Sequence, residues 1–476
     1  MGIATRVTYK PLTDSTVYTK GAQAVFPEQD FLAPLYIVSR ASIDDGVGGQ
    51  YITDYSYAGA KLHRQGRGLL GFREVKSSDP QTGVATVTTF RQDFPYTGMV
   101  ESNLRIYNGT VIDETDNSLA AVMDINGNAG VVFPYISRSV QRNYDVPTGS
   151  PAGALIKTVQ TDTTYDVSQG ANYGNPSTIT IVTTATSGEI YSKHTIHNYA
   201  PPDFVNWVLD RVISTSVQHA GTGQQAITKT SGFSYYSNGL LFEEIIEPNA
   251  GASSPLYLRT SYEYDGFGNK TRVSVTGLKG YDDTAGSEAR LTETVYDSKG
   301  RFPLWTKNSL NHQETYVYDS RFGTRSNLTG PNGLTTSWVY DSFGRKVKEA
   351  RADGTVTTWS YDFCGNTDCP NGGFIETVAT SGGSLVKTYH DALQRVIRTE
   401  STALDGVLVY QDTRYDARGN VASKTRPYFA SGGAAQLTTF TYDDLNRPIR
   451  EDAPDGANVD YLYTGFYRNT RRTHDS

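Results

Sequence analysis

The sequence predicts an all-β protein: a long, curling antiparallel sheet of repeated hairpins that forms part of a hollow shell, with little helix. A tyrosine-aspartate turn motif recurs through the second half of the chain, and the segments between copies alternate in side-chain character with period two. Aromatic residues make up 12% of the chain, with 33 Tyr and 46 Gly, whereas hydrophobic residues reach only 37%. Such a composition favours many strands and turns around little deep core, as in a sheet that is wet on one face.

Charge and hydropathy exclude several other classes of protein. The formal net charge is -7 and the mean hydropathy is -0.46. A small net charge with plentiful aromatic residues argues against disorder, and mild acidity argues against a nucleic-acid-binding surface. The sequence shows no apolar run of signal-peptide or membrane-span length.

The repeat dictates the architecture. Its shortest spacing is the 21 residues from Tyr340 to Tyr361, and its longest is the 32 residues from Tyr264 to Tyr296. Self-similarity at this period is typical of arrays in which each unit is stable only against its neighbours. We predict that the structural repeat is formed by Tyr264, Asp265, Gly268, Tyr296, Asp297, Gly300, Tyr318, Asp319, Tyr340, Asp341, Gly344, Tyr361, Asp362, Gly365, Tyr389, Tyr415, Asp416, Gly419, Tyr442, Asp443, Trp338 and Trp359.

One unit can be built from its residues. In the segment 334–340, alternation places Trp338 and Tyr340 on one face of a strand. Residues 341–344 then reverse the chain, because Asp can hydrogen-bond the backbone two residues on and Gly accepts a positive φ. After a return strand and a second turn, Trp359 repeats Trp338. We therefore expect Trp to pack on Trp and Tyr on Tyr, with about 0.2 to 1 kcal/mol for each cross-strand pair.

Three regions follow from the pattern. Residues 1–140 form a first β domain, residues 141–235 an irregular β region with degenerate repeats, and residues 236–476 the regular repeats. We expect one continuous sheet through both borders. The best helix candidate, residues 202–214, mixes β-branched and aromatic residues and reads equally well as a strand.

Two glycine-rich motifs resemble ligand-binding loops. Gly66, Gly68 and Gly71 have the spacing of a dinucleotide fingerprint, but no apolar strand precedes them and no helix pattern follows, so tight bends are favoured. Residues 124–130 begin like a calcium loop. Ala129 and Tyr135 stand where that loop needs Gly and Glu, which favours an ordinary turn.

The candidate metal ligands are poorly placed. His194 and His197 would point to opposite faces of a strand. Cys364 and Cys369 have no second Cys or His pair beside them, so two unpaired loop thiols are favoured over a disulfide or a metal site. We predict no cofactor and no metal.

The acidic pairs do not single out a catalytic site. Glycoside hydrolysis needs two carboxylates that face each other, whereas adjacent residues of a strand face apart. This applies to Glu243-Glu244, Asp282-Asp283 and Asp443-Asp444. We predict no catalytic residue and no enzymatic activity. The aromatic ladder is interpreted as packing, with a carbohydrate-binding cell-surface repeat module as the alternative.

The Tyr-Asp units with their Gly-Arg or Gly-Asn turns resemble the YD repeats of the Rhs family, which also occur in the B and C components of Tc insecticidal toxin complexes and in teneurins. The first region strengthens the resemblance. It contains Tyr57-Ala-Gly-Ala-Lys-Leu-His63, Gln65-Gly-Arg-Gly-Leu-Leu-Gly-Phe72, Asp79-Pro-Gln-Thr-Gly83 and Thr89-Phe-Arg-Gln-Asp-Phe-Pro-Tyr96. These segments are similar to the middle region of the Tc B component and its SpvB-like relatives.

The resemblance implies a β shell, or cocoon, that encapsulates a C-terminal toxin polypeptide and works with other toxin-complex components in virulence. It also implies a bacterial protein, made in the cytoplasm and secreted as part of that complex. The aspartate-bearing core segment with which the family cleaves its toxin has no counterpart here. We therefore expect a fragment that lacks this autoproteolytic core and the toxin, and whose unpaired edge strands promote self-association.

Overall fold

The structure is a computed structural model of the chain. It describes residues 3–123, 130–150, 153–165, 173–252, 254–278, 287–364, 373–432, 434–465 and 467–473. The first twelve strands are β1 (Thr5–Pro11), β2 (Tyr18–Thr19), β3 (Glu28–Asp30), β4 (Tyr36–Asp44), β5 (Gln50–Ala58), β6 (Lys61–His63), β7 (Gly68–Leu69), β8 (Glu74–Asp79), β9 (Val84–Phe90), β10 (Val100–Tyr107), β11 (Thr110–Val122) and β12 (Phe133–Tyr144).

The middle of the chain continues as strands that range in length from 11 to 5 residues. These strands are β13 (Leu155–Tyr165), β14 (Pro176–Ala185), β15 (Ile190–Tyr199), β16 (Val212–Gly221), β17 (Ile227–Tyr235), β18 (Leu241–Ile246), β19 (Leu258–Tyr264), β20 (Lys270–Leu278), β21 (Ser287–Tyr296), β22 (Pro303–Asn308), β23 (Gln313–Tyr318) and β24 (Arg325–Thr329). A 3-10 turn, η2 (Pro248–Ala250), lies between β18 and β19.

The last part of the chain consists of shorter hairpins. Its strands are β25 (Thr335–Tyr340), β26 (Lys346–Ala350), β27 (Val356–Phe363), β28 (Phe374–Thr380), β29 (Val386–His390), β30 (Val396–Thr402), β31 (Leu408–Tyr415), β32 (Val421–Thr425), β33 (Tyr428–Phe429), β34 (Leu437–Tyr442), β35 (Pro448–Asp452), β36 (Asn458–Thr464) and β37 (Tyr467–Thr473).

The predicted all-β fold is confirmed. Among the described residues, 34 strands belong to one sheet, and β3, β6 and β7 form a second sheet of three strands. The large sheet begins β1, β4, β5, β8, and from there strands adjacent in sequence pair antiparallel up to β32. It then continues through β34 to β37. Residues 202–211 form a loop with a bridge between Asp203 and Val208, and residues 212–214 begin β16.

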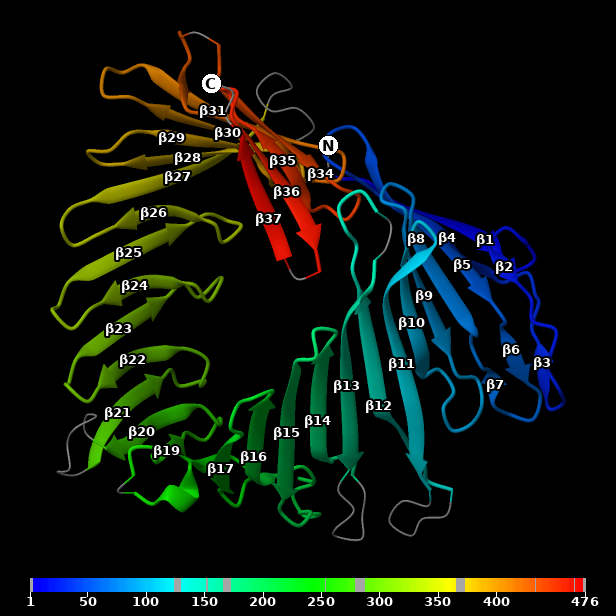
Figure 1. The fold of residues 1–476 in the computed structure, drawn as a ribbon. Helices are drawn as coiled ribbons and strands as arrows, with labels where there is room; N and C mark the ends of the chain where they lie inside the picture. The colour runs from blue at the N-terminus through cyan, green and yellow to red at the C-terminus, as the bar shows by residue number, and fades with distance from the viewer. Residues whose placement is uncertain are drawn as a thin grey trace.

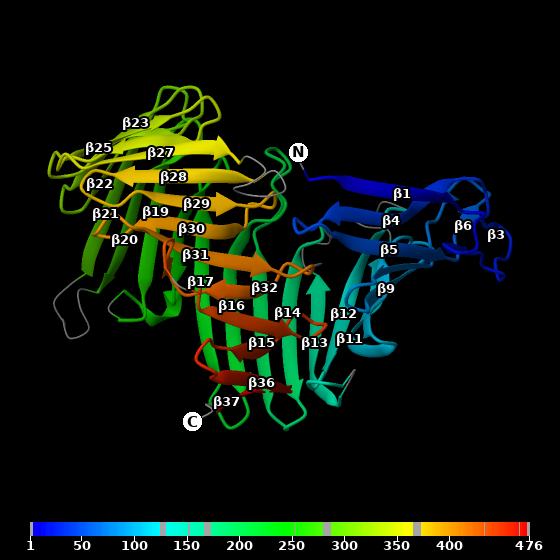
Figure 2. The ribbon, with the colours of Figure 1, turned by 90° about the horizontal axis from the view of Figure 1, so that it is seen from above.

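The sheet curls back on itself (Figure 1). The ribbon passes from the blue N-terminal strands through the cyan and green strands to the yellow ones, and its orange and red strands return to the blue and cyan ones. Seen from above, the orange C-terminal strands point toward the blue N-terminal strands (Figure 2). β1 pairs with β4 and β37 with β36, so the curl is not closed by pairing between the first and last strands.

A small hydrophobic core lies under the N-terminal strands. Leu12, Val17, Tyr18, Ile37 and Ala60 are buried together there, and partly buried aromatic residues pack against them. The three-stranded sheet lies beside this core and contains the glycine motif of residues 66–71. Its three glycines have φ values of 98°, 72° and 81°, as tight bends require. The described ranges contain no helix long and apolar enough to span a membrane.

The sheet runs across both borders drawn from the sequence. The first border, at residue 140, falls inside β12, which pairs with β11 on one side and β13 on the other. The second border lies at the end of β17, which pairs with β16 and β18. The expectation of a continuous sheet is therefore met at both positions.

Candidate functional site

Each Tyr-Asp turn is organised by its aspartate. In the turn between β25 and β26, Asp341 Oδ1 accepts hydrogen bonds from the backbone N–H of Phe343 and of Arg345, both at 2.9 Å. Gly344 has φ 77°, a conformation that favours glycine. The Asp341 N–H in turn donates to the Arg345 carbonyl at 2.9 Å, which closes the hairpin. One side chain thus satisfies two backbone donors at the tip of the hairpin.

The same hydrogen-bonding pattern recurs along the sheet. An aspartate accepts from the N–H groups two and four residues later at Asp265, Asp391, Asp416 and Asp443. It also occurs at Asp45, between β4 and β5, a turn that the sequence pattern had not identified. Gln394 and Asn446 occupy the glycine position with φ values of 63° and 60°.

At one repeat position, the structure differs from the sequence prediction, which placed Tyr389 there. His390, and not Tyr389, precedes the turn aspartate Asp391, and its ring stacks on Phe374 with 4.4 Å between centroids. Tyr389 therefore faces the opposite side of the strand, where its hydroxyl donates to Glu400 at 2.9 Å. Two ring-bearing residues before the aspartate made the register ambiguous in the sequence.

The repeat tyrosines link each unit to the one before it. The hydroxyl of Tyr340 donates to the Arg325 carbonyl at 2.6 Å, which belongs to the preceding return strand. Equivalent bonds join Tyr264 to Leu241, Tyr361 to Lys346, Tyr415 to Val396, Tyr442 to Val421 and Tyr463 to Pro448. Tyr199 and Tyr235 make the same contact with Pro176 and Val212, so this device begins before residue 236.

Arginines at the end of the turn connect successive units on the same face. Arg345 Nε donates to Asp341 Oδ2 at 2.7 Å, and its guanidinium lies 4.3 Å from the ring centroid of Tyr361 in the next unit. Burial raises the pKa of Asp341, but the N–H groups and guanidinium that donate to it lower that pKa more, and the net shift is downward. The carboxylate is therefore the stable form of Asp341 in the turn.

One charged residue, Lys346, bridges the two tryptophans. Lys346 Nζ lies 5.7 Å from the Trp338 ring and 5.2 Å from the Trp359 ring, so Lys346 lies within cation-π reach of both rings. This arrangement differs from the direct stacking of Trp on Trp expected from the period. Trp338 Nε1 donates to Glu349 at 2.9 Å, and this hydrogen bond lowers the pKa of the Glu349 carboxyl.

The last Tyr-Asp turns meet the first strands along a line that we call the seam. It joins the turns at 391–395, 416–420, 443–447 and 463–465 to the turns and strand ends at 45–51, 79–84, 105–108 and 145–148. Hydrogen-bonded partners across it are between 301 and 350 residues apart in the sequence. Along the seam, the C-terminal strands of the curled sheet contact its N-terminal strands.

Two of the turn arginines cross the seam. Arg395 Nη2 donates to the carbonyl of Asp45 at 2.8 Å, and Arg447 Nη2 donates to the carbonyl of Val146 at 2.8 Å. Both keep the contacts of the repeat, because their guanidinium groups still pair with the turn aspartate and lie over the tyrosine of the following unit. At the seam, each of these arginines therefore donates from an N–H group that its contacts within the repeat leave available.

Backbone and hydroxyl contacts extend the seam on both sides. Tyr107 donates to Asp444 Oδ2 at 2.7 Å, and this hydrogen bond raises the pKa of the tyrosine. The N–H of Tyr463 donates to Thr148 Oγ1 at 3.0 Å, and the N–H of Gly465 donates to Asp145 Oδ1 at 2.9 Å. Asp45 is fully buried at the other end of the seam. These contacts are polar, so specific donors and acceptors help to hold the seam.

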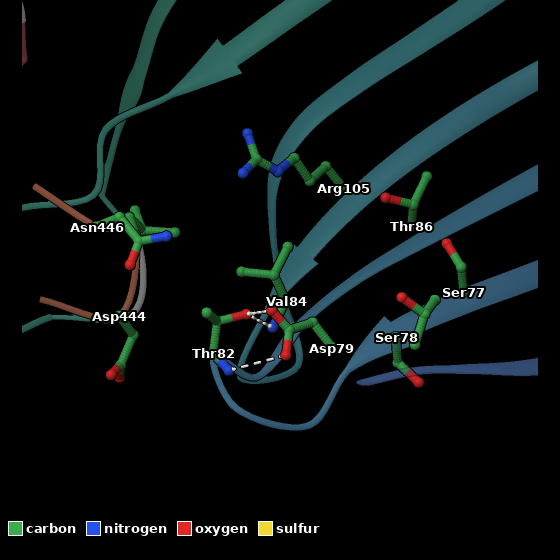
Figure 3. Close-up of a pocket in the computed structure, with 11 residues that line it drawn as sticks. Ser77, Ser78, Asp79, Thr82, Val84, Thr86, Arg105, Asp444 and Asn446 are labelled. Carbon is green, nitrogen blue, oxygen red and sulfur yellow. Dashed lines mark hydrogen bonds between the residues drawn. The ribbon is translucent and has the colours of Figure 1, made fainter. Parts of the chain in front are cut away.

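A polar cavity of about 330 Å³ lies within the seam. Figure 3 shows Asp444 and Asn446 reaching it from the C-terminal turn, and Thr82, Val84 and Arg105 from the N-terminal strands. Asp79 fixes one wall, because its carboxylate accepts the hydroxyl of Thr82 at 2.9 Å. The lining offers mainly hydrogen-bonding groups, and the described residues contain no cluster suited to hold a metal ion.

The other candidate residues have structural surroundings. His194 and His197 contact Thr180 and Thr215 across strands, and Glu243 is paired with Arg259. Cys364 is disulfide-bonded, which corrects the expectation of unpaired thiols. A disulfide needs Cα atoms within about 7 Å of each other, and cysteines this close in the sequence can meet that limit. Residues outside the described ranges include Cys369, Gly365, Asp282, Asp283 and positions 124–129.

Comparison with protein families identifies the first region. Residues 1–98 match the family model described as the insecticide toxin TcdB middle/N-terminal region. This match contains the motifs between Tyr57 and Tyr96 on which the resemblance was based, and it confirms that prediction for the first region. No curated protein matches the chain.

Solved structures show the fold of the whole chain. A TcdB2-TccC3 crystal structure matches with a TM-score of 0.70 at 12% identity, over 99% of this chain and 34% of that chain. A TcdB2-TccC3-Cdc42 structure matches with 0.69 at 10% identity, over 99% and 35%. The Tc holotoxin pore of Photorhabdus luminescens, with a substitution in TccC3, matches with 0.68 at 10% identity, over 99% and 35%.

The chain thus spans about a third of the length of the solved chains that it matches. At these identities the likeness concerns the fold. The family match adds sequence evidence for the first region alone. The chain therefore contains a Tc toxin B-component-like region in residues 1–98, and its fold is similar to about a third of the TcdB2-TccC3 chain.

Proposed function

We propose that the chain is a structural segment of a Tc-type toxin shell that encapsulates a toxin polypeptide. The observation that carries the proposal is the seam: a continuous sheet curls until turns more than 300 residues apart bond to each other. A wall of this kind can separate an enclosed polypeptide from its surroundings. The family match in residues 1–98 and the fold of the toxin-complex structures support the same role.

The proposed role requires no chemistry from the side chains. The conspicuous residues of the repeat serve as connectors, because the aspartates hold turns, the tyrosine hydroxyls bond carbonyls and the arginines join units. We therefore propose a non-enzymatic protein. The comparisons give no support to the alternative of a carbohydrate-binding module.

Partners and location follow from the same proposal. The matched structures contain TccC3 together with TcdB2, and we propose that this chain likewise assembles with other components of a toxin complex. Secretion and a part in virulence would follow from that assembly. The Rhs-type YD repeat is the proposed building unit of the wall between residues 236 and 476.

Protection of an attached polypeptide tests the proposal. The full chain would carry an added unfolded segment after Ser476, and limited proteolysis would measure how fast that segment is cleaved. We expect slower cleavage in the wild-type background than in Arg395→Ala/Arg447→Ala, which removes both guanidinium contacts across the seam. Arg345→Ala is the matched control, because this arginine occupies the same turn position away from the seam.

Equal cleavage in all backgrounds, at the rate of the free segment, would count against encapsulation. Circular dichroism and thermal melting of each variant establish that the wall is folded during the assay.

A further inference from the structure

The turns of the sheet form two rims. The Tyr-Asp rim contains the turns at 265–269, 341–345, 391–395, 416–420 and 443–447. The opposite rim contains the alternate turns, among them 45–49, 308–312 and 330–334. Hairpins place successive turns at alternate edges of a sheet, so each unit contributes one turn to each rim. At the seam, the Tyr-Asp rim of the last units contacts the opposite rim of the first strands.

One position of the Tyr-Asp turn enters the seam directly. Leu393, two residues after Asp391, is half-buried, and a Cβ added at Gly46 would lie 3.1 Å from its Cδ1. Leu445, two residues after Asp443, is also half-buried and lines the cavity of the seam. In these two turns, the apolar side chain at this position thus packs against the N-terminal strands across the seam.

The same position carries larger exposed side chains elsewhere on the rim. Phe267, two residues after Asp265, is 66% exposed, and Phe343, two residues after Asp341, is 80% exposed. Arg345 is also open to solvent there, with its side chain 45% exposed, whereas Arg395 in the seam is 16% exposed. The turn 341–345 therefore has both elements of the seam, an apolar tip and a guanidinium. The turn 265–269 has the apolar tip, with Asn269 at the arginine position.

The complementary surface is uncovered as well. The opposite rim presents Leu310 in the turn 308–312 and Leu334 in the turn 330–334, which are 72% and 57% exposed. The backbone carbonyls of such turns are the groups that accept the arginines at the seam. Each molecule thus carries both halves of a seam-like contact, with neither half used in this region.

We propose that the Tyr-Asp rim between residues 265 and 345 docks the opposite rim of a second copy of this chain. The contact continues the geometry of the seam from one molecule to the next: phenylalanine tips pack between hairpin turns, and Arg345 donates to a turn carbonyl. Because different surfaces meet, the contact is heterologous and adds copies in a row. The proposal concerns the outer rims and does not depend on an enclosed toxin.

Sedimentation velocity over a concentration series tests the proposal. We expect the wild type to self-associate, and Phe267→Ser/Phe343→Ser to raise the dissociation constant by about tenfold or more, since buried aromatic anchors dominate such contacts. The control Val317→Ser/Val339→Ser removes two valines that are 54% and 51% exposed on strand faces. This control should leave the dissociation constant within about twofold of the wild-type value.

A photo-crosslinker at position 343 identifies the contact. We expect Phe343→p-benzoylphenylalanine to link to the turns of the opposite rim, around Leu310 and Leu334, in a second copy distinguished by isotope labelling. Links to β1 or β37 would assign the association to the exposed sheet edges and overturn the proposal. A wild type that stays monomeric, or a rim variant that associates like the wild type, would overturn it too.

Discussion

Two turns of identical design behave differently in this molecule. In the turns at 341–345 and 391–395, the arginine donates to the turn aspartate at 2.7 Å in both cases. It lies over the next tyrosine at 4.3 Å in the first and 4.5 Å in the second. Only the second turn meets the N-terminal strands, where Arg395 also donates to the carbonyl of Asp45.

The difference shows that the place of a repeated turn in the fold changes the burial of its ion pair. The aspartate of the seam turn, Asp391, is 5% exposed in its side chain, against 20% for Asp341. Burial makes an ion pair sensitive to the loss of one partner, because the remaining charge is then left without solvent. The repeat therefore supplies the same arginine at several turns, Arg345, Arg395 and Arg447 among them. The curl of the sheet decides which of these arginines also reach the N-terminal strands.

The largest expected effect is the loss of Arg395. We predict that Arg395→Ala destabilises the seam by about 2 to 4 kcal/mol, because it leaves the Asp391 carboxylate buried and unpaired. Hydrogen exchange, read by mass spectrometry, should rise in peptides covering residues 45–58 and 391–402. Arg345→Ala should produce a smaller change, confined to its own hairpins. Equal changes in the two variants would show that the seam adds nothing to the repeat.

A second prediction compares two glycines with the same backbone conformation. Gly419 and Gly354 both have φ 84°, but an added Cβ at Gly419 would lie 2.5 Å from the hydroxyl of Tyr51, whereas nothing lies within 4 Å at Gly354. Gly354→Ala should cost about 1 to 2 kcal/mol from backbone strain alone. Gly419→Ala should cost about 1 to 2 kcal/mol more, since Tyr51 must move.

Urea denaturation of the two variants measures this difference. The double variant Gly419→Ala/Tyr51→Phe, which removes the clashing hydroxyl, should recover part of the loss. If the two single variants are equally destabilised, Tyr51 does not hold the position across the seam that the structure gives it.

A third prediction compares two tyrosine hydroxyl bonds, that of Tyr389 in β29 and that of the repeat tyrosine Tyr442 in β34. Tyr389→Phe removes a hydrogen bond to Glu400, which is 6% exposed, and we expect a loss of about 1.5 to 3 kcal/mol because the acceptor is a carboxylate. Tyr442→Phe removes a bond to a backbone carbonyl, for which we expect about 1 kcal/mol. Thermal unfolding ranks the two. The reverse order would indicate that Tyr389 occupies the repeat position after all.

The smallest expected effect is a pH dependence at Trp338. Its hydrogen bond holds the pKa of Glu349 below the ordinary value, so the resulting stability is present at neutral pH and is lost as the pH falls through that lowered pKa. Trp338→Phe should lower the melting temperature slightly at neutral pH, and the difference from the wild type should narrow as the pH falls through the lowered pKa of Glu349. Trp359→Phe serves as the control. A difference that stays constant with pH would exclude this coupling.

Local structure could be predicted from particular residues. The alternation before Tyr340 gave a strand, Asp341 and Gly344 gave the hairpin, and β25 and its turn lie at these positions. These features depend on interactions within a few residues of the chain. The register at Tyr389 and His390 could not be predicted, because the face of each ring depends on Phe374 and Glu400 in neighbouring strands.

The sequence by itself determined the local structure of the sheet. β-branched and aromatic residues form the strands, Asp and Gly form the turns, and the repeated units pack side by side. Only the tertiary structure decided which turns contact each other along the seam. Asp45 is one turn aspartate among many in the sequence, and nothing local relates it to Arg395, 350 residues away. That pairing depends on the twist and curl added by every intervening strand, and sheet curvature is a property of the assembled strands.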